Sequence, residues 1–351
     1  MLNKPQPFLK TGSLLIKKLS KSREITAILF LLFLFLGVGM VNPNFLTFSN
    51  IMLSLNGGVV YTIIAIGIAF VIITGEIDVS VGATMGMSAA VFATLIRDGS
   101  NWTLAALIAV SIGLVIGLIN GVGVTVLHIP SIIMTLGING IVRGLMYVFT
   151  GGKWVENLPA GFKALSQVSV GPVTLFYLAA LVFMVIVHLT LTRTRRGRYL
   201  AAVGDNVSGA TLLGIPVTGV KVASFVLCGM LAAVGGILYV SRVGFVTPIA
   251  GSGYEMKVIA ACVLGGISLT GGVGSVIGAT VGAAIMASIS RVLVFLGFSS
   301  DYDNTITGIL LITIVVADAL LQRQAQERAR RARLMAKTAH GDDVSGEAHH
   351  G

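Results

Sequence analysis

Charged side chains are scarce in this chain of 351 residues, since Asp, Glu, Lys and Arg together make up 11% of it. Soluble domains carry about 25% of these residues, so the shortage excludes an ordinary soluble protein. Hydrophobic residues instead reach 55%, and the mean hydropathy is +0.94. The 44 glycines suit helices that pack closely in a membrane. The composition predicts an all-α, polytopic membrane protein.

Cysteine is almost absent, and the motifs of catalytic chemistry are missing. The two cysteines, Cys228 and Cys262, lie in apolar stretches without CxxC spacing, which argues against a disulfide framework or a metal site. His128 and His188 lack a ligand-spaced partner. The chain has no GxxxxGK[ST] phosphate loop and no Ser, His and Asp arrangement that supports hydrolase chemistry. We therefore expect no catalytic residue, metal or cofactor, and any ATP must bind to a separate subunit.

Ten apolar stretches approach the roughly 20 residues that cross a bilayer. The eighth is short for a full span and contains Gly265 and Gly266, so a broken or re-entrant segment is the alternative there. Counts of nine or eleven spans stay open. The ten stretches are 25–41, 55–73, 79–96, 103–127, 131–149, 173–192, 217–240, 256–270, 273–297 and 304–321.

Most of the 24 lysines and arginines gather in three clusters, within 4–23, 193–198 and 323–337. With ten spans these clusters fall on one side of the membrane, and the positive-inside rule makes that side the cytoplasm. Both termini are then cytoplasmic, and the net charge of +10 reflects topology and contact with membrane lipid rather than nucleic-acid binding. The expected parts are a basic segment at 1–24, a membrane domain at 25–321 and a polar, disordered tail at 322–351.

The longest internal loop, 193–216, has the pattern of a short structured element. Asp205 or Asn206 suits the start of a short helix, and Gly214 with Pro216 suits its end. In one interpretation this amphipathic helix docks in a groove of a soluble partner. In the other it is an ordinary surface helix that rests on the bilayer.

Two acids, Glu76 and Asp78, lie between the second and third apolar stretches. A carboxylate at that place costs free energy unless something compensates it. Three interpretations are open: proton-coupling groups of a secondary carrier, gate residues of an ATP-driven permease, or caps at the start of the third span. Capping is the simplest of them for Asp78.

The segment around these acids has an echo farther along the chain. Residues of 74–86 recur at 270–282 with a constant offset of 196, among them Gly75 as Gly271 and Gly82 as Gly278. Glycine-interrupted segments in corresponding halves point to the core of a transporter. Helices rich in Gly, Ala and Thr also resemble one another by composition alone, so both explanations stay open.

A substrate rich in hydroxyl groups needs polar side chains along its path. Asn120, Thr135 and Asn139, on the fourth and fifth stretches, have that chemistry. Hydrogen bonds between helices would use the same side chains equally well.

Three strings carry a family resemblance: GEIDVSVG at 75–82, RRGRYLAAVGDNVSGATLLGI at 195–215 and GSGYEMKVIAACVLGGISLTGGVGSVIGA at 251–279. They resemble permease subunits of the ribose-type ABC importers. The resemblance implies a protein of the bacterial inner membrane that pairs with a second permease copy or a related permease, sits on a cytoplasmic ATPase subunit and receives substrate from a periplasmic binding protein. Its motif and gate positions here are Gly75, Glu76, Asp78, Gly82, Glu255, Gly265, Gly266, Gly271 and Gly278.

The same resemblance assigns a role to the loop 193–216. Many importer permeases have an E-A-A-x-x-x-G pattern in the helix that couples to the ATPase, and its positions here are occupied by Ser208, Gly209, Ala210 and Gly214. Ser208 stands where the family has Glu, so the salt bridge that this acid would make is absent.

Other strings resemble the autoinducer-2 permeases within this family. They are SREITAI at 22–28, TGGKWVENLP at 150–159 and GYEMKVIAACVLGGISLTGG at 253–272. The substrate that this implies is autoinducer-2, with rhamnose, ribose or another monosaccharide as alternatives. A proton-coupled secondary carrier that uses Glu76 and Asp78 is the more distant alternative.

Overall fold

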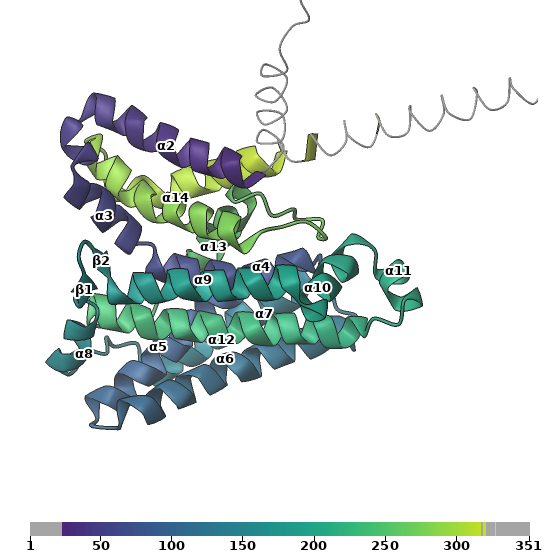
Figure 1. Ribbon diagram of the computed structural model, residues 1–351. Coiled ribbons are helices and arrows are strands. Elements are labelled where there is room, and N and C mark those ends of the chain that lie inside the picture. Colours follow the sequence, from purple (N-terminus) through teal and green to yellow (C-terminus); the bar gives the residue numbers. More distant parts are fainter. Residues whose placement is uncertain (1–22, 317–318, 321–326, 328–351) are drawn as a thin grey trace, which may run out of the picture. The chain divides into compact units, whose positions relative to one another are not determined.

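The computed structural model describes residues 23–316, 319–320 and 327, and most of these are helical (Figure 1). The all-α class is therefore confirmed. The chain divides into two units, Met1–Gly308 and Ile309–Gly351, and the described residues of the second unit are all helical. The predicted basic segment 1–24 lies almost wholly outside the described residues, as does the tail 322–351.

The described part of the first unit begins with helix α2 (Arg23–Val41) and the short 3₁₀ helix η1 (Pro43–Leu46). The elements up to the internal loop are α3 (Phe48–Asn56), α4 (Val59–Ile73), α5 (Val81–Arg97), α6 (Trp102–Thr125), α7 (Ser131–Thr150), α8 (Ala160–Leu165), the antiparallel hairpin β1 (Ser169–Val170) and β2 (Val173–Thr174), and α9 (Leu175–Arg193). The loop and the remaining chain form α10 (Arg195–Asp205), α11 (Val207–Leu212), α12 (Val217–Val243), α13 (Tyr254–Leu264), α14 (Val276–Phe295), η2 (Ser300–Tyr302) and a last helix, Asp303–Val316.

Helix α4 lies in the interior of the first unit. Every residue of α4 except Tyr61 is buried, and the helix packs against α12, α13 and α14. Its sequence, VVYTIIAIGIAFVII, is apolar on all sides, and a helix of this kind must be covered on every face. The chain leaves α4 through Thr74 and Gly75, whose φ of +81° suits glycine.

Helices α2, α6, α7 and α9 form much of the outer surface. Only 22%, 28%, 28% and 17% of their respective spans is buried inside the molecule. Large apolar side chains such as Leu107, Ile133 and Val148 are exposed on them. A surface of this kind needs a hydrocarbon environment, because water would have to hydrate it at a cost of roughly 25 cal/mol per Å².

The high glycine content brings helices close together, as the composition predicted. The clearest case is the contact between α6 and α12, where a methyl group added to Gly121 would lie 2.9 Å from the Cα atom of Val222. Small residues at such contacts replace the hydrophobic effect as a source of helix association in lipid, because they let backbones approach.

The number of spans differs from the sequence-based expectation. Six described helices are long and apolar enough to cross a membrane, and a seventh results if α3 and α4, bent by 45° at their junction, form one span. Each of the ten predicted stretches contains a helix, but α4, α5, α13 and the last helix each have fewer than 18 residues. Ten spans are therefore not confirmed.

The eighth stretch is a broken segment, which was the alternative to a full span. Helix α13 ends at Leu264, because Gly265 terminates it and Gly266 adopts a left-handed φ of +85°. The chain then runs without a helix as far as Ser275. A continuous helix through residue 270 was therefore wrong.

Short elements mark the two ends of the long helices. Helices α10 and α11 lie at one end of α12, where α11 projects beyond its neighbours (Figure 1). Helix α8 and the β1–β2 hairpin lie at the opposite end of α12 (Figure 1). The first unit therefore has two distinct ends, and the loop 193–216 belongs to one of them.

Candidate transport site and coupling loop

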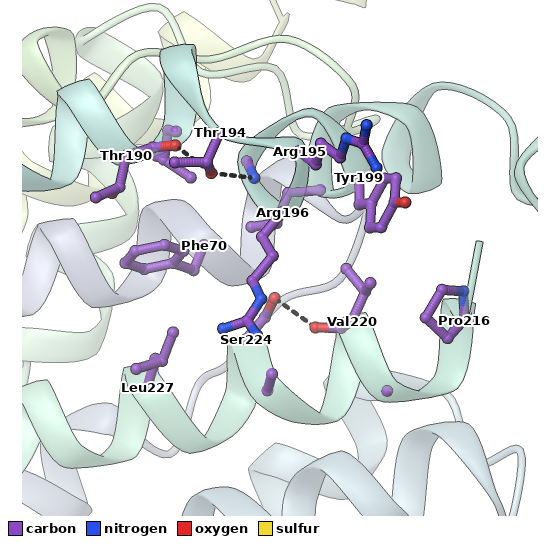
Figure 2. A pocket seen from close by; sticks show the side chains of 15 residues that line it. Phe70, Thr190, Thr194, Arg195, Arg196, Tyr199, Pro216, Val220, Ser224 and Leu227 are labelled. Carbon is purple, nitrogen blue, oxygen red and sulfur yellow. Dashed lines mark hydrogen bonds between the residues drawn. The ribbon is translucent and has the colours of Figure 1, made fainter.

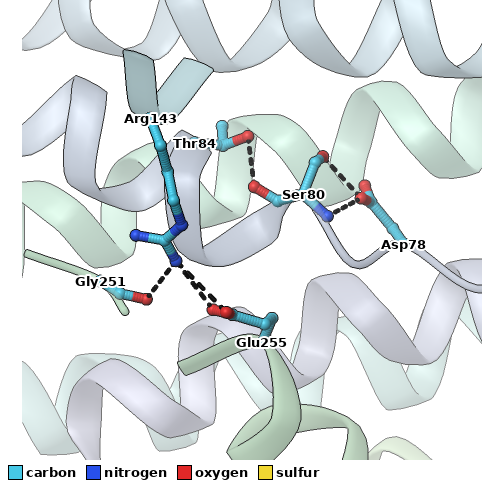
Figure 3. Close-up of polar contacts among 6 residues, drawn as sticks. All are labelled: Asp78, Ser80, Thr84, Arg143, Gly251 and Glu255. Atoms are coloured by element: carbon cyan, nitrogen blue, oxygen red, sulfur yellow. Dashed lines mark hydrogen bonds and ion pairs between the residues drawn. The ribbon is translucent and has the colours of Figure 1, made fainter. Parts of the chain in front are cut away.

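The loop between α4 and α5 is held by a buried carboxylate. Asp78 is 1% exposed, and its Oδ1 accepts hydrogen bonds from the backbone N–H of Ser80 (2.8 Å) and from the Ser80 hydroxyl (2.6 Å; Figure 3). Ser80 is the residue before α5. Asp78 therefore stabilises the turn that leads into α5. It does not accept a hydrogen bond from the first backbone N–H groups of the helix, so it is not a helix cap in the usual sense.

Two of the three predicted path residues bind this loop. The Asn120 side-chain amide donates to the Ser80 hydroxyl (2.8 Å), and the backbone N–H of Val79 donates to the Thr135 hydroxyl (3.1 Å). Asn120 and Thr135 are both fully buried. These are hydrogen bonds between elements, as the alternative interpretation expected. In the described part of the chain the side-chain oxygens of Asn120 and Asn139 are buried without a hydrogen-bond partner.

Glu76 is paired rather than free. The Nζ atom of Lys221, near the start of α12, lies 2.5 Å from Glu76 Oε1. The Lys221 side chain is 16% exposed and the Glu76 side chain is 15% exposed. Glu76 is thus neither a helix cap nor an uncompensated charge. Lys221 was not predicted as a site residue, although a lone lysine inside the apolar stretch 217–240 is a signal that such a partner exists.

A second ion pair joins α7 to α13. Arg143 Nη2 lies 3.2 Å from both carboxylate oxygens of Glu255 and 3.4 Å from the carbonyl oxygen of Gly251 (Figure 3). The Arg143 side chain is 27% exposed and that of Glu255 is 12% exposed. Glu255 was predicted from the family motif, whereas Arg143 was missed. Its signal was again a single charge in an apolar stretch.

Gly82 connects this ion pair to the turn at Asp78. It lies in the first turn of α5, and a methyl group on it would meet the Glu255 carboxylate and lie 2.5 Å from the carbonyl oxygen of Gly251. The family positions Gly82 and Glu255 therefore lie against each other at the first turn of α5, and Asp78 lies in the turn that leads into the same helix.

The two echoing segments meet in space. Gly75 and Gly271 both adopt left-handed φ values, +81° and +86°, and a Cβ added to Gly271 would lie 2.8 Å from the Cα of Gly75. The backbone N–H of Gly272 donates to the carbonyl oxygen of Ile73 (2.9 Å). The other echoing glycine, Gly278, packs in the same way against the backbone of Gly265 at the end of α13.

The loop 193–216 is structured, as predicted. Asn206 begins α11, because its side-chain oxygen accepts the backbone N–H of Gly209 at 2.8 Å. Gly214, with φ +72°, follows the end of α11. Ala210 is buried and Ser208 is exposed.

An apolar tip forms where α11 ends. Leu212 is 89% exposed and Leu213 is 79% exposed. Two adjacent leucines with so little cover cost free energy in water, so contact with a partner or with the bilayer surface would stabilise them.

Helix α10 connects this tip to the echoing loops. A Cβ added to Gly204, near the end of α10, would overlap the backbone of Ile73, and one added to Gly272 would lie 2.9 Å from the Cα of Asp205. The end of α10, which directly precedes α11, therefore rests on both loops. The start of α12 also contacts the loop between α4 and α5, through the ion pair of Lys221 with Glu76.

Replacing Gly82 with alanine is expected to displace Glu255 or the chain at Gly251. Since a backbone carbonyl cannot swing aside as a flexible side chain does, we expect a destabilisation of about 1–3 kcal/mol, measured by thermal unfolding in detergent. Gly37→Ala on α2 is the matched control, because its added methyl group would meet no atom within 4 Å. Equal stability of the two variants would contradict the close packing at Gly82.

Comparison with known proteins identifies the family. The model of a family described as "Branched-chain amino acid transport system / permease component" matches residues 50–315. The autoinducer 2 import system permease protein LsrC of Enterobacter sp. (strain 638) is 42% identical over 316 residues, covering 90% of this chain and 92% of that protein. Proteins of the same name from Salmonella typhi and Yersinia enterocolitica are 39% and 40% identical, covering 90% and 88% of this chain and 91% and 86% of their own lengths.

No solved structure matches the chain. The family model matches most of the length of this chain, and the outward-facing apolar helices agree with a multi-pass protein of the inner membrane. The chain belongs to the permease family of the ABC importers, whose members are the non-enzymatic translocation subunits of these transporters.

Proposed function

We propose that this chain is the translocation subunit of an ATP-driven importer for autoinducer-2. The observation that carries the proposal is the similarity to permeases of that name along nearly the whole of both chains. Permeases for ribose, rhamnose or another monosaccharide are the alternatives, because a small solute with several hydroxyl groups would use the same polar groups.

The proposed topology has ten membrane-crossing segments, with α5, α13 and the last helix as short crossings, and both termini in the cytoplasm. The support is the charge distribution. Four arginines gather within 193–198 at the end of the first unit that carries α10 and α11, and basic clusters favour the cytoplasmic side. Helix α8 and the β1–β2 hairpin would then face the periplasm.

The proposed partners follow from this orientation. An ATPase subunit would cover α11, where Leu212 and Leu213 are exposed and where Ser208, Gly209, Ala210 and Gly214 take the family's coupling positions. A periplasmic binding protein would dock at the end with α8, and a second permease copy or a related permease would complete the path. ATP would bind to the ATPase subunit alone.

The contacts suggest how movement of α11 reaches the membrane interior. A displacement of α11 pushes the end of α10 against Ile73 and Gly272, which carry the turn at Asp78 and the start of α14. The pair of Lys221 with Glu76 moves α12 together with the first of these loops. Asn139 supports a polar path, because its buried side-chain oxygen is left without a partner in the described residues.

Uptake by proteoliposomes tests this proposal. The vesicles contain this permease with its ATPase, and the binding protein is supplied outside together with autoinducer-2. We expect uptake that requires ATP, survives a protonophore, and is competed poorly by ribose or rhamnose. Faster uptake of either sugar than of autoinducer-2 would overturn the substrate assignment. Uptake without ATP that collapses with the protonophore would favour the secondary carrier.

A further inference from the structure

A groove lies outside the site described above, between α9, α10 and the first half of α12. It encloses about 850 Å³. Phe70 of α4 lies at its inner side, and Val220 and Leu227 of α12 line its length (Figure 2). Leu227 is 41% exposed. Apolar side chains in this groove therefore lack a full cover within the described chain.

The threonine and serine hydroxyl groups that line the groove all donate to backbone carbonyl oxygens. Thr190 donates to the carbonyl oxygen of Val187 (2.8 Å), Thr194 to that of Thr190 (2.6 Å), and Ser224 to that of Val220 (2.9 Å). Each hydroxyl is satisfied by its own helix. Apart from Tyr199 and two arginines, the rest of the lining is apolar, which suits an acyl chain.

The rim of the groove is basic. Arg195 and Arg196, at the start of α10, both line it and are both exposed. Within the residues that the structure describes, neither guanidinium has a hydrogen-bond or ion-pair partner, and no acidic side chain lines the groove. In Figure 2 the Arg196 side chain extends from α10 across the groove toward Val220 and Ser224.

We propose that this groove binds an anionic phospholipid. Its phosphate lies on Arg195 and Arg196, and an acyl chain lies along Val220 and Leu227 over Phe70. Guanidinium groups hold phosphate through charge-assisted hydrogen bonds, and basic pockets between helices on the cytoplasmic side suit the headgroups of anionic lipids. The proposal requires a membrane-spanning chain with α10 at the cytoplasmic surface, but it does not depend on the transported substrate.

The shape of the groove favours a lipid over the ATPase as its occupant. The lining on α12 runs from Pro216 to Leu227, which corresponds to roughly 16 Å along a helix at 1.5 Å per residue. That depth takes the groove from the basic rim into the apolar belt, where a soluble subunit cannot follow. A bound lipid would tie α10 to α12 and so steady the segment that carries α11.

The test uses the detergent-purified transporter complex and a photoactivatable phosphatidylglycerol. Arg195→Gln with Arg196→Gln is expected to lower crosslinking by roughly tenfold. The matched control, Arg193→Gln with Arg198→Gln, removes the same charge from the same cluster at positions that do not line the groove, and should stay within about twofold of the wild type. Phosphatidylcholine carrying the same photoactivatable group should crosslink weakly to all three proteins.

A second variant keeps the charge and fills the groove. Ala223→Trp, at an exposed lining residue of α12, should also lower phosphatidylglycerol crosslinking, and mass spectrometry should place the wild-type crosslink on α9, α10 or α12. Equal losses in the two double-arginine variants, or equal labelling by phosphatidylcholine, would overturn the proposal. The proposal would also be overturned if the bound ATPase prevented the lipid from labelling the groove. None of these outcomes depends on autoinducer-2 uptake.

Discussion

Replacing Leu212 and Leu213 with aspartate is expected to abolish substrate-stimulated ATP hydrolysis in the assembled transporter. Both side chains are almost fully exposed in the permease, so the change costs the isolated subunit little. In the proposed complex they enter the ATPase, where burying each leucine contributes about 1.5–3 kcal/mol. Aspartate loses that contribution and adds the cost of burying a charge.

The measurement is ATPase activity with and without the loaded binding protein, alongside recovery of the permease from membranes. Leu212→Met with Leu213→Met keeps the apolar surface and should retain coupling. Normal membrane levels with lost stimulation would support the coupling role of α11. If the aspartate variant is stimulated as strongly as the wild type, then α11 is an ordinary surface helix.

Removing Arg143 is expected to be the most destabilising single change at the candidate transport site. Arg143→Met leaves the Glu255 carboxylate, 12% exposed, without its counter-charge. Leaving one member of a buried pair uncompensated costs about 3–5 kcal/mol. Glu255→Gln should cost less, roughly 1.5–3 kcal/mol, because Arg143 is 27% exposed and its long side chain can turn toward a more polar environment.

Thermal unfolding of the purified variants and their transport rates measure this difference. The double variant Arg143→Met with Glu255→Met should be more stable than Arg143→Met alone, because no buried charge remains. Arg97→Met breaks a pair whose side chains are 38% and 57% exposed and should cost no more than about 1 kcal/mol. A double variant less stable than Arg143→Met would refute the idea that the unpaired carboxylate causes the loss.

Helix positions could largely be predicted from apolar periodicity and length. The predicted stretch 131–149 became α7 at Ser131–Thr150, and 217–240 became α12 at Val217–Val243. The prediction failed at the eighth stretch, where Ile267 is apolar and buried but lies in a loop. Hydropathy reports that a residue avoids water, but it does not distinguish a buried loop from a membrane span.

Part of the candidate site could also be predicted from the sequence. Glu76, Asp78 and Glu255 stand out as acids in apolar surroundings, and Asn206 was one of two candidates for the start of α11. The ion-pair partners of Glu76 and Glu255 could not be predicted from the sequence. Lys221 is 145 residues from Glu76, and Arg143 is 112 residues from Glu255. Nothing local in the chain connects such positions.

Composition and motif spacing were sufficient for the membrane class, the permease family and the existence of a structured loop at 193–216, because these depend on residue type and order along the chain. The three-dimensional packing decided that Glu76 is neutralised by Lys221, that Asp78 shapes a turn, and that Gly75 and Gly271 meet. Charge compensation and close approach depend on distances between segments far apart in sequence, and those distances arise only when the helices pack.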